Sequence, residues 1–210
     1  MKFGIIGSGK IGSTLAKLLI DIGEDVAIAN SRGPESMTDL VSELGDSAQA
    51  MSVEDAMAFG DWVILAVPLK AVPDLPTEPV KGKLVIDVCN YYPDRDGEID
   101  LGSKTSSEWV AKHFADSQIV KAYNTIHFQQ LAEQGDKNKP IPERRAIFVA
   151  GDDAIARQNI MGLTMDLGFG PVGCGELENS VEFQPGAPVY NVDMTQAEGE
   201  AKMREKLGLV

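Results

Sequence analysis

The chain has 210 residues, 43% of them hydrophobic and 6% aromatic, a composition typical of a folded globular protein. Acidic residues outnumber basic ones by 32 to 19, and the net charge of -13 disfavours general binding to nucleic acid or to an anionic membrane, both of which require an excess of Lys and Arg. Since the chain has two cysteines and two histidines, we expect neither a disulfide framework nor a metal site.

In chain order, short apolar runs alternate with segments that have helical periodicity. The apolar runs predict strands at residues 2–6, 26–29, 61–68, 82–90, 118–126, 144–153 and 170–179. The periodic segments predict helices at residues 10–23, 34–44, 52–60, 106–114, 153–168 and 196–210. This alternation indicates an α/β fold of the Rossmann type, with a doubly wound, mostly parallel sheet and a small C-terminal extension.

The predicted elements suggest how the chain is divided. We expect a Rossmann domain at residues 1–150 and a small continuation on the substrate side at residues 151–210. No run reaches the ~18 apolar residues of a transmembrane helix, and the N-terminus lacks the pattern of a signal peptide. We therefore expect a cytoplasmic protein that has no membrane partner.

A glycine-rich loop follows the first predicted strand and opens the first predicted helix. It reads Gly7-Ser8-Gly9-Lys10-Ile11-Gly12 and matches the G-x-G-x-x-G pattern of dinucleotide-binding loops. In such loops the glycines permit a tight turn, the approach of a pyrophosphate and close packing of the helix. Free N–H groups at the helix N-terminus then bind phosphate. The sequence therefore predicts a dinucleotide site on an otherwise acidic protein.

The end of the second predicted strand indicates which dinucleotide is bound. In NAD sites an Asp or Glu at this position binds the 2′-hydroxyl of the ribose. This chain has Asn30, Ser31 and Arg32 there, and no carboxylate. A Ser hydroxyl and a guanidinium bind the 2′-phosphate that a carboxylate would repel. We therefore expect NADP(H) as the cofactor.

Several segments carry a resemblance to a known family. "IGSGKIGSTLA", "NSR", "LAVP", "YNTI" and "VAGDDAIARQNIMGLTMDLGFGPVGCGELENS" resemble the coenzyme F420-dependent NADP oxidoreductases, whose NADPH-binding domain is similar to the cytosolic domain of the six-transmembrane metalloreductases. The resemblance spans nearly the whole chain and implies that a small C-terminal part covers the nicotinamide end of the cofactor. It departs at Asn124 and His127, where archaeal deazaflavin reductases have His and Pro, so it implies NADP(H) more directly than the acceptor.

The resemblance also implies which residues contact NADP(H). Carried over residue by residue, it places the 2′-phosphate at Ser8, Ser31 and Arg32, and the middle of the cofactor at residues 67–68. It places the nicotinamide near residues 124–126. The complete set expected to contact the cofactor is Gly7, Ser8, Gly9, Lys10, Ile11, Gly12, Asn30, Ser31, Arg32, Ala66, Val67, Pro68, Asn90, Asn124, Thr125 and Ile126.

Candidate catalytic residues follow from the type of reaction. Hydride transfer between NADPH and a flavin-like ring needs two rings held face to face, whereas carbonyl or imine reduction uses a proton donor near the reacting atom. His127 and Asn124, near the end of a predicted strand, are the candidates. Tyr91 and Tyr92 follow another strand end, where they either stack on a ring or pack within the loop.

Three functions stay open. The first is hydride transfer between NADP(H) and a small-molecule acceptor that is a deazaflavin (coenzyme F420) or a flavin. The second is reduction of a small carbonyl or imine in a pocket that a homodimer completes. The third is a non-catalytic NADPH-binding sensor. An open, partly apolar cleft at the nicotinamide end favours the first, a partner subunit over that end favours the second, and a sealed end favours the third.

Overall fold

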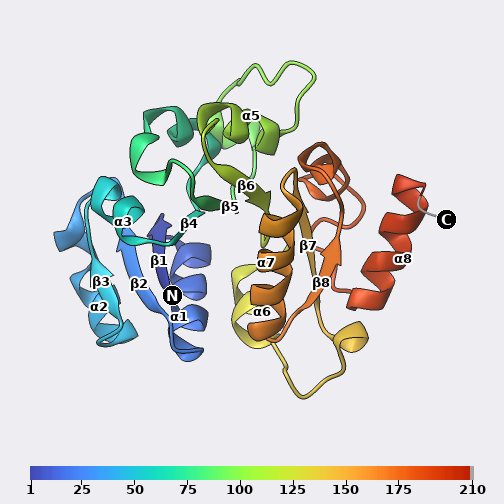
Figure 1. The fold of residues 1–210 in the computed structure, drawn as a ribbon, viewed down its shortest axis with the longest axis horizontal. Helices are drawn as coiled ribbons and strands as arrows, with labels where there is room; N and C mark the ends of the chain where they lie inside the picture. The colour runs from blue at the N-terminus through green and yellow to red at the C-terminus, as the bar shows by residue number, and fades with distance from the viewer. Residues whose placement is uncertain (209–210) are drawn as a thin grey trace.

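One eight-stranded sheet, in the order β3-β2-β1-β4-β5-β6-β7-β8, runs through the computed structural model, which describes residues 1–208 (Figure 1). The strands are β1 (Lys2–Ile6), β2 (Asp25–Ala29), β3 (Ala48–Ala50), β4 (Trp62–Leu65), β5 (Leu84–Asp87), β6 (Gln118–Lys121), β7 (Ala146–Gly151) and β8 (Gly170–Gly173). Neighbouring strands from β3 to β6 are parallel, β7 is antiparallel to β6, and β8 is parallel to β7.

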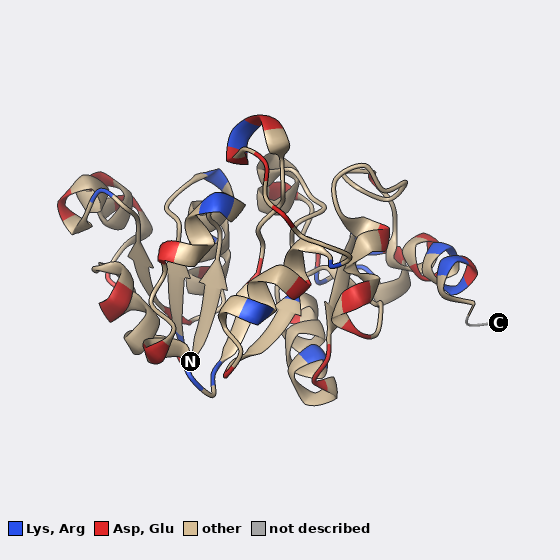
Figure 2. Cartoon of the chain, turned by 90° about the horizontal axis from the view of Figure 1, so that it is seen from above, with Lys and Arg blue, Asp and Glu red and all other residues tan. Residues whose placement is uncertain are grey.

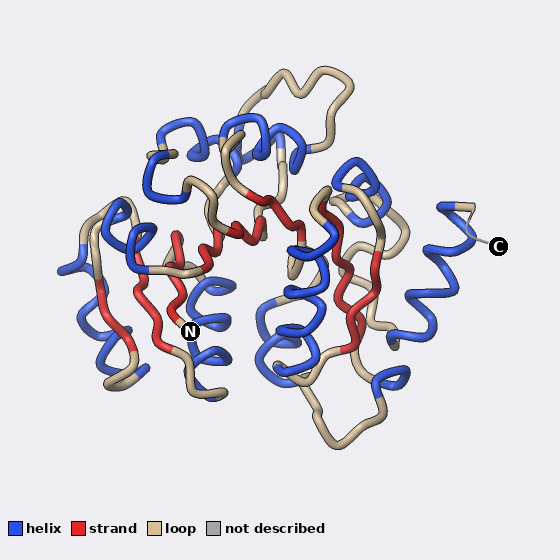
Figure 3. Tube along the Cα trace, viewed as in Figure 1, coloured by secondary structure: helices blue, strands red, loops and turns tan. Residues whose placement is uncertain are grey.

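Helices connect the strands and cover both faces of the sheet (Figure 3). The α-helices are α1 (Lys10–Asp21), α2 (Thr38–Leu44), α3 (Val53–Phe59), α4 (Pro93–Asp96), α5 (Ser106–His113), α6 (Phe128–Glu133), α7 (Ala154–Asp166) and α8 (Gln196–Leu207). Short 3-10 helices are η1 (Pro34–Met37), η2 (Leu69–Asp74), η3 (Glu78–Val80), η4 (Ile141–Glu143) and η5 (Leu177–Phe183). The prediction of a doubly wound, mostly parallel sheet is confirmed.

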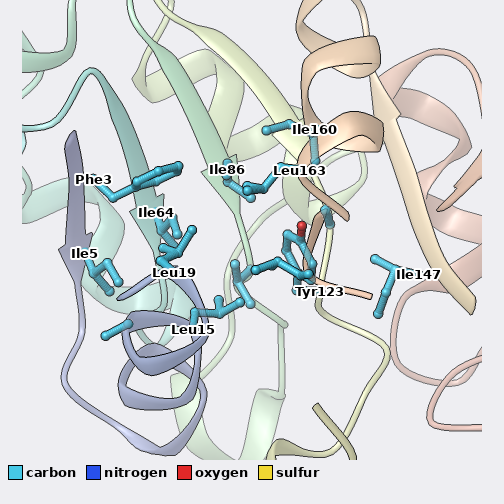
Figure 4. Close-up of a cluster of buried hydrophobic side chains, with 14 of the residues drawn as sticks. Phe3, Ile5, Leu15, Leu19, Ile64, Ile86, Tyr123, Ile147, Ile160 and Leu163 are labelled. Carbon is cyan, nitrogen blue, oxygen red and sulfur yellow. The ribbon is translucent and has the colours of Figure 1, made fainter. Parts of the chain in front are cut away.

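Apolar side chains form separate layers on the two faces, because successive residues of a strand point to opposite sides. In β4, Ile64 packs in the layer formed with α1, α6 and α7, whereas Val63 and Leu65 pack in the layer formed with α3 and α5. Figure 4 shows the first layer, where side chains of β1, β4 and β5 meet those of α1 and α7. A third cluster, which includes Phe148 and Met203, joins α8 to β7 and β8.

Several predicted boundaries are wrong. The strand predicted at residues 118–126 ends at Lys121, because Tyr123 has φ +57° and turns the chain out of the extended conformation. The strand predicted at 170–179 ends at Gly173, and η5 follows it. The C-terminal helix, predicted to reach residue 210, ends at Leu207, and positions 209–210 of that prediction lie outside the described residues.

Two short elements have no signal in the sequence. β3 has three residues, Ala48–Ala50, too few to produce a period, and α6 has six residues with one fully buried side chain. The domain boundary expected at residue 150 falls inside β7, in the same continuous sheet as β1 to β6. The division into residues 1–150 and 151–210 stays a prediction.

The charged residues are concentrated outside the sheet. Figure 2 shows Asp and Glu on helices and loops along the whole molecule, interspersed with Lys and Arg. Within residues 1–208, no helix has both the length and the apolar character needed to cross a bilayer.

Candidate functional site

The carboxyl ends of neighbouring parallel strands line up along one edge of the sheet. Across β2, β1, β4, β5 and β6, the paired residues are Ala29, Ile6, Leu65, Asp87 and Lys121. The next backbone groups continue the pairing, as in the 2.8 Å hydrogen bonds from the N–H groups of Gly7 and Ala66 to the carbonyls of Ala29 and Ile6. The loops that follow these strands therefore start side by side, at the edge where open α/β sheets bind ligands.

A groove of about 510 Å³ lies over the ends of β1, β2 and β4, and we call it the loop groove. It brings together many of the residues that the sequence predicts at the cofactor, namely Gly7, Ser8, Gly9, Asn30, Ser31, Arg32, Ala66, Val67 and Pro68. The two ends of the predicted dinucleotide signature, the glycine loop and the end of β2, thus face one groove.

The three glycines of the loop have different surroundings. A Cβ atom on Gly7 would lie 2.2 Å from the carbonyl oxygen of Ala66, and one on Gly12 would lie 1.8 Å from that of Gly7. These two positions exclude a side chain because backbones meet there. A Cβ on Gly9 would meet no atom within 4 Å. Gly9 is the N-cap of α1, which has neither a side-chain cap nor an acidic residue in its first turn, so its N–H groups are available to an anion.

The loop after β2 is held by hydrogen bonds to the side chain of Asn30. The Arg32 N–H donates to Asn30 Oδ1 at 2.8 Å, and the Ser36 hydroxyl donates to the Gly33 carbonyl at 2.7 Å. These bonds fix the backbone while the side chains of Ser31 and Arg32 remain exposed. Within residues 1–208, Arg32 forms no ion pair with a carboxylate. Its guanidinium is therefore free to bind an anion.

A second cavity of about 300 Å³ lies over the ends of β4, β5 and β6, and we call it the strand-end cavity. It shares Ala66, Val67 and Pro68 with the loop groove, so the two spaces adjoin at the end of β4. Of the other residues predicted at the site, it is lined by Ile11, Asn90, Asn124, Ile126 and His127. A dinucleotide in the loop groove would reach this cavity with its far end.

One wall of the strand-end cavity is a pair of asparagines that bind each other. Asn90 Nδ2 donates to the backbone oxygen of Asn124 at 2.9 Å, and Asn124 Nδ2 donates to Asn90 Oδ1 at 3.2 Å and to the Phe183 carbonyl at 3.1 Å. Asn124 is 4% exposed, and its Oδ1 has no hydrogen-bond partner among the described residues. A buried acceptor without a partner favours a ligand that donates a hydrogen bond.

The other wall contains two tyrosines and an arginine. Tyr190, from the segment after η5, accepts a 3.1 Å hydrogen bond from Asn90 Nδ2, and its hydroxyl is hydrogen-bonded to that of Tyr92. Arg95 donates to the Asn90 carbonyl at 2.6 Å and forms an ion pair with Asp96 at 2.8 Å. Its guanidinium carbon lies 5.0 Å from the centre of the Tyr92 ring. These side chains close the cavity on the side of the C-terminal segment.

A buried ion pair holds the backbone next to one wall of the strand-end cavity. Lys121 Nζ lies 3.1 Å from Asp87 Oδ2, with both side chains almost completely buried, and it also donates to the Cys89 carbonyl. Asp87 Oδ2 accepts from the Ser107 hydroxyl at 2.8 Å, and Asp87 Oδ1 accepts from the Cys89 N–H at 2.9 Å. Cys89 precedes Asn90, so the ion pair fixes the backbone that carries one wall of the cavity.

Three residues predicted at the cofactor line neither space. Gly12 and Thr125 are buried, and Lys10 is exposed on α1 with its ammonium 4.5 Å from the centre of the Phe128 ring. Tyr91, one of the two loop tyrosines, bonds within its own loop instead, since its hydroxyl lies 3.0 Å from both the Gly97 carbonyl and the Ile99 N–H.

Sequence reasoning missed several residues of the strand-end cavity. Tyr190 comes from a segment with no recognisable pattern, 100 positions after Asn90 in the chain, and only the fold brings it there. Arg95 lies in α4, the short helix that follows β5, so the rule that ligands bind beyond strand ends could have identified it. Within the described part of the chain, no group of His, Cys, Asp and Glu is arranged to hold a metal ion.

Comparisons with known proteins find similar sequences and similar folds. Residues 2–91 match the family model for NADP oxidoreductase, coenzyme F420-dependent. Metalloreductase STEAP2 of Mus musculus is 28% identical over 183 residues, covering 86% of this chain and 35% of that protein. The human STEAP2 protein is 27% identical over 86% of this chain. The chain thus spans about a third of the length of the curated relatives that it matches.

Two solved structures resemble the whole chain. The hypothetical protein SMa0349 of Sinorhizobium meliloti is 33% identical, with a TM-score of 0.82 over 93% of this chain and 95% of that one. A candidate F420-dependent NADP reductase from Arthrobacter sp. FB24 is 19% identical, with a TM-score of 0.73 over 99% of this chain and 95% of that one, and shows the same fold. The family model matches residues 2–91, somewhat less than half of the chain, so the resemblance seen in the sequence is confirmed for these residues, and the solved structures have the same Rossmann-type fold.

Proposed function

We propose that the protein binds NADP(H) across the loop groove and the strand-end cavity and transfers hydride between it and a deazaflavin- or flavin-like acceptor. The pyrophosphate would lie over Gly9, where the structure leaves open space beside the N-terminus of α1. The residues at the end of β4, which line both spaces, would contact the middle of the cofactor.

The 2′-phosphate would be held at the end of β2. Ser31 and Arg32 are exposed on a loop whose backbone Asn30 fixes, and no carboxylate pairs with Arg32 within residues 1–208. A guanidinium binds phosphate through two hydrogen bonds and keeps its charge at any working pH. These features favour NADPH over NADH.

The nicotinamide end would lie in the strand-end cavity. There the partnerless Oδ1 of Asn124 matches the carboxamide N–H of a nicotinamide, which would supply the missing donor. Asn90 holds Asn124 in place through two hydrogen bonds. We assign Asn124 the role of orienting the ring, and we place Ile126 against it.

The observation that supports hydride transfer to an external acceptor is the open cavity at the nicotinamide end. Bound NADPH supplies the hydride, and the chain holds the two reacting groups together and limits water. Ile11, Val67, Ile126 and Phe128 give the cavity apolar walls suited to a ring. A non-catalytic sensor would not require such an opening. The proposal keeps the cytoplasmic location expected from the sequence.

A second candidate function is reduction of a small carbonyl or imine. The phenol hydroxyls of Tyr92 and Tyr190 at the cavity favour it, because these substrates require a proton as well as a hydride. In this case a homodimer would complete the cavity over its open side. The two candidates share NADP(H) as the hydride donor and differ in the acceptor and in the need for a partner subunit.

A panel of acceptors tests both candidates. NADPH oxidation by the purified protein would be followed with a deazaflavin, FMN, ferric chelates and small carbonyls, with the Gly9→Val variant as the control for contaminating reductases. We expect turnover with the deazaflavin or FMN that the variant lacks. Turnover with carbonyls alone would favour the second candidate, and tight NADPH binding without oxidation by any acceptor would contradict both.

A further inference from the structure

Two phenol hydroxyls meet at the strand-end cavity and leave one hydrogen unused. Tyr92 and Tyr190 both line the cavity, and their hydroxyls share a single hydrogen bond. Each phenol carries one hydrogen, and the bond between them uses one, whichever of the two donates. One phenolic O–H therefore remains, and the hydrogen bonds found within residues 1–208 give it no acceptor; the Asn191 side chain, which also lies beside the Tyr190 hydroxyl, lowers the pKa of that phenol and so stabilises its phenolate. A donor without an acceptor at a cavity wall favours a ligand with an accepting atom.

The position of the pair is fixed from both sides. The Asn90 amide, which also holds Asn124, donates to the Tyr190 hydroxyl at 3.1 Å. Arg95 packs over the Tyr92 ring, and Asp96 holds the Arg95 guanidinium through Nε at 3.0 Å as well as through its ion pair. Asn90 thus links the wall that carries the free O–H to Asn124, the residue that we place at the nicotinamide.

The surroundings of the Tyr190 phenol favour its protonated form. Burial, together with the hydrogen bond to Tyr92, raises the pKa of the Tyr190 phenol. Besides the pair itself, the charged and titratable residues that line the cavity are Arg95, which is paired with Asp96, and His127, Cys89 and Tyr123. Burial raises the pKa of the Cys89 thiol and of the Tyr123 phenol. Arg95 is the permanent cation among them and would stabilise a phenolate that forms transiently.

We propose that the Tyr92–Tyr190 pair is the proton donor of the reaction: it gives its free O–H to the acceptor atom on which the arriving hydride places negative charge. This inference rests on the proposed function and requires an acceptor with a nitrogen or oxygen that takes up the displaced electron pair. In deazaflavins and flavins that atom is a ring nitrogen conjugated with the atom that receives hydride, and in simple carbonyls and imines it is the oxygen or nitrogen doubly bonded to that atom.

The step balances in atoms and electrons. The acceptor gains a hydride as the C–H bond of the reduced nicotinamide breaks, and a new bond to hydrogen forms on the acceptor. The electron pair displaced within the acceptor moves to its nitrogen or oxygen. That atom takes the phenol proton, so one O–H bond breaks and one N–H or O–H bond forms. Solvent then returns a proton to the phenolate, and the net reaction consumes NADPH, the acceptor and one proton.

The Tyr92→Phe, Tyr190→Phe double variant tests the proposal, with Tyr91→Phe as the matched control from the same loop. The hydroxyl of Tyr91 bonds within its loop and lies outside the cavity. We expect the double variant to bind NADPH as the wild type does and to lose ~10²-fold or more in kcat with the acceptor that the wild type uses best, the usual contribution of a general acid. Tyr91→Phe should keep the wild-type rate.

The pH profile separates a proton donor from a structural role. With the phenols present, we expect a rate that is level between about pH 6 and about pH 9, because the raised pKa keeps the donor protonated. In the double variant the proton comes from solvent, so the rate should fall by up to about tenfold for each pH unit. A ternary complex with NADP+ and oxidised acceptor, titrated by fluorescence, should also be weaker in the double variant, because one hydrogen bond to the acceptor is lost.

The outcomes distinguish this inference from the proposed function. An active wild type whose double variant keeps both the rate and the level pH profile overturns the proton-donor role and leaves the function standing. If the wild type fails to oxidise NADPH with every acceptor that is tested, both the inference and the proposed function are overturned. A double variant that has lost NADPH affinity together with its rate assigns the pair a structural role and also overturns the inference.

Discussion

The side-chain amide of Asn30 donates a 2.8 Å hydrogen bond to the hydroxyl of Ser8, and so joins the end of β2 to the glycine loop after β1. Asn30 Nδ2 also lies 3.0 Å from the Ser36 hydroxyl, and Asn30 Oδ1 accepts a hydrogen bond from the Arg32 N–H. Asn30 occupies the place where NAD-binding proteins carry a carboxylate. Here it sets the distance between the expected pyrophosphate site and the expected 2′-phosphate site without adding negative charge.

Arg32→Ala should remove most of the preference for NADPH. A phosphate held by a guanidinium contributes about 1.5–3 kcal/mol, so NADPH affinity should fall by about tenfold to a hundredfold while NADH affinity changes little. Calorimetric titration with both nucleotides measures this, with Arg204→Ala on α8 as a surface arginine control. Equal affinity of the wild type for the two nucleotides would contradict the assignment of Ser31 and Arg32.

Gly9→Val should abolish NADPH binding and leave the fold in place. A side chain at Gly9 meets no protein atom within 4 Å, so the cost in stability should be about 1 kcal/mol, that of a poor N-cap. It would, however, occupy the space expected for the pyrophosphate.

Gly12→Ala provides the contrast within the same loop. Its Cβ would lie 1.8 Å from the Gly7 carbonyl oxygen, so urea unfolding should show a loss of about 1–3 kcal/mol or more. If Gly9→Val binds NADPH as the wild type does, the pyrophosphate does not lie over Gly9 and the glycine loop serves only as a structural turn.

The parts of the site that the sequence could predict are those built from local signals. A glycine loop and the end of β2 are each read within a few residues, and the parallel sheet then brings them together at one edge. The place of β4 inside the sheet follows from a similar local signal, since its fully apolar run is typical of a strand in the buried middle of a parallel sheet.

The C-terminal side of the site could not be predicted in this way. Tyr190 reaches Asn90 because the chain reverses at β7, passes through α7 and β8, and returns over the strand ends after η5. No periodic pattern encodes that return, and polar residues such as Arg95 read simply as loop residues. The early end of β6 likewise depends on Tyr123, whose hydroxyl bonds Thr164 of α7 at 2.9 Å, a tertiary contact.

Removing only one partner of the buried ion pair between Asp87 and Lys121 should lower the free energy of unfolding. Lys121→Met leaves the Asp87 carboxylate buried without its cation, and we expect a loss of about 3–5 kcal/mol in the free energy of unfolding. The double variant Lys121→Met, Asp87→Asn removes both charges, keeps an oxygen for the Cys89 N–H, and places an amide N–H opposite the Ser107 hydroxyl, which can accept it. Urea unfolding should find it more stable than the single variant, and a double variant less stable than Lys121→Met would contradict the pairing.

His127→Ala should lower turnover only a few-fold. His127 is exposed at the start of α6, and its ring packs against that of Phe128 with 4.5 Å between the ring centres, so it forms part of the cavity mouth. If hydride passes between two rings and the tyrosine pair gives the proton, the imidazole contributes packing alone, and His127→Gln should retain more activity than His127→Ala because it keeps more of the contact area. An imidazole acting as the acid would instead make both variants ~10²–10⁴-fold slower, with Gln no better than Ala. Steady-state rates of both variants, measured with saturating NADPH and the preferred acceptor, decide between the two roles. The two tyrosines and His127 line the same cavity. Equally large rate losses in the tyrosine variants and in the His127 variants would mean that the acceptor requires two donors, and would contradict the assignment of the proton to the Tyr92–Tyr190 pair alone.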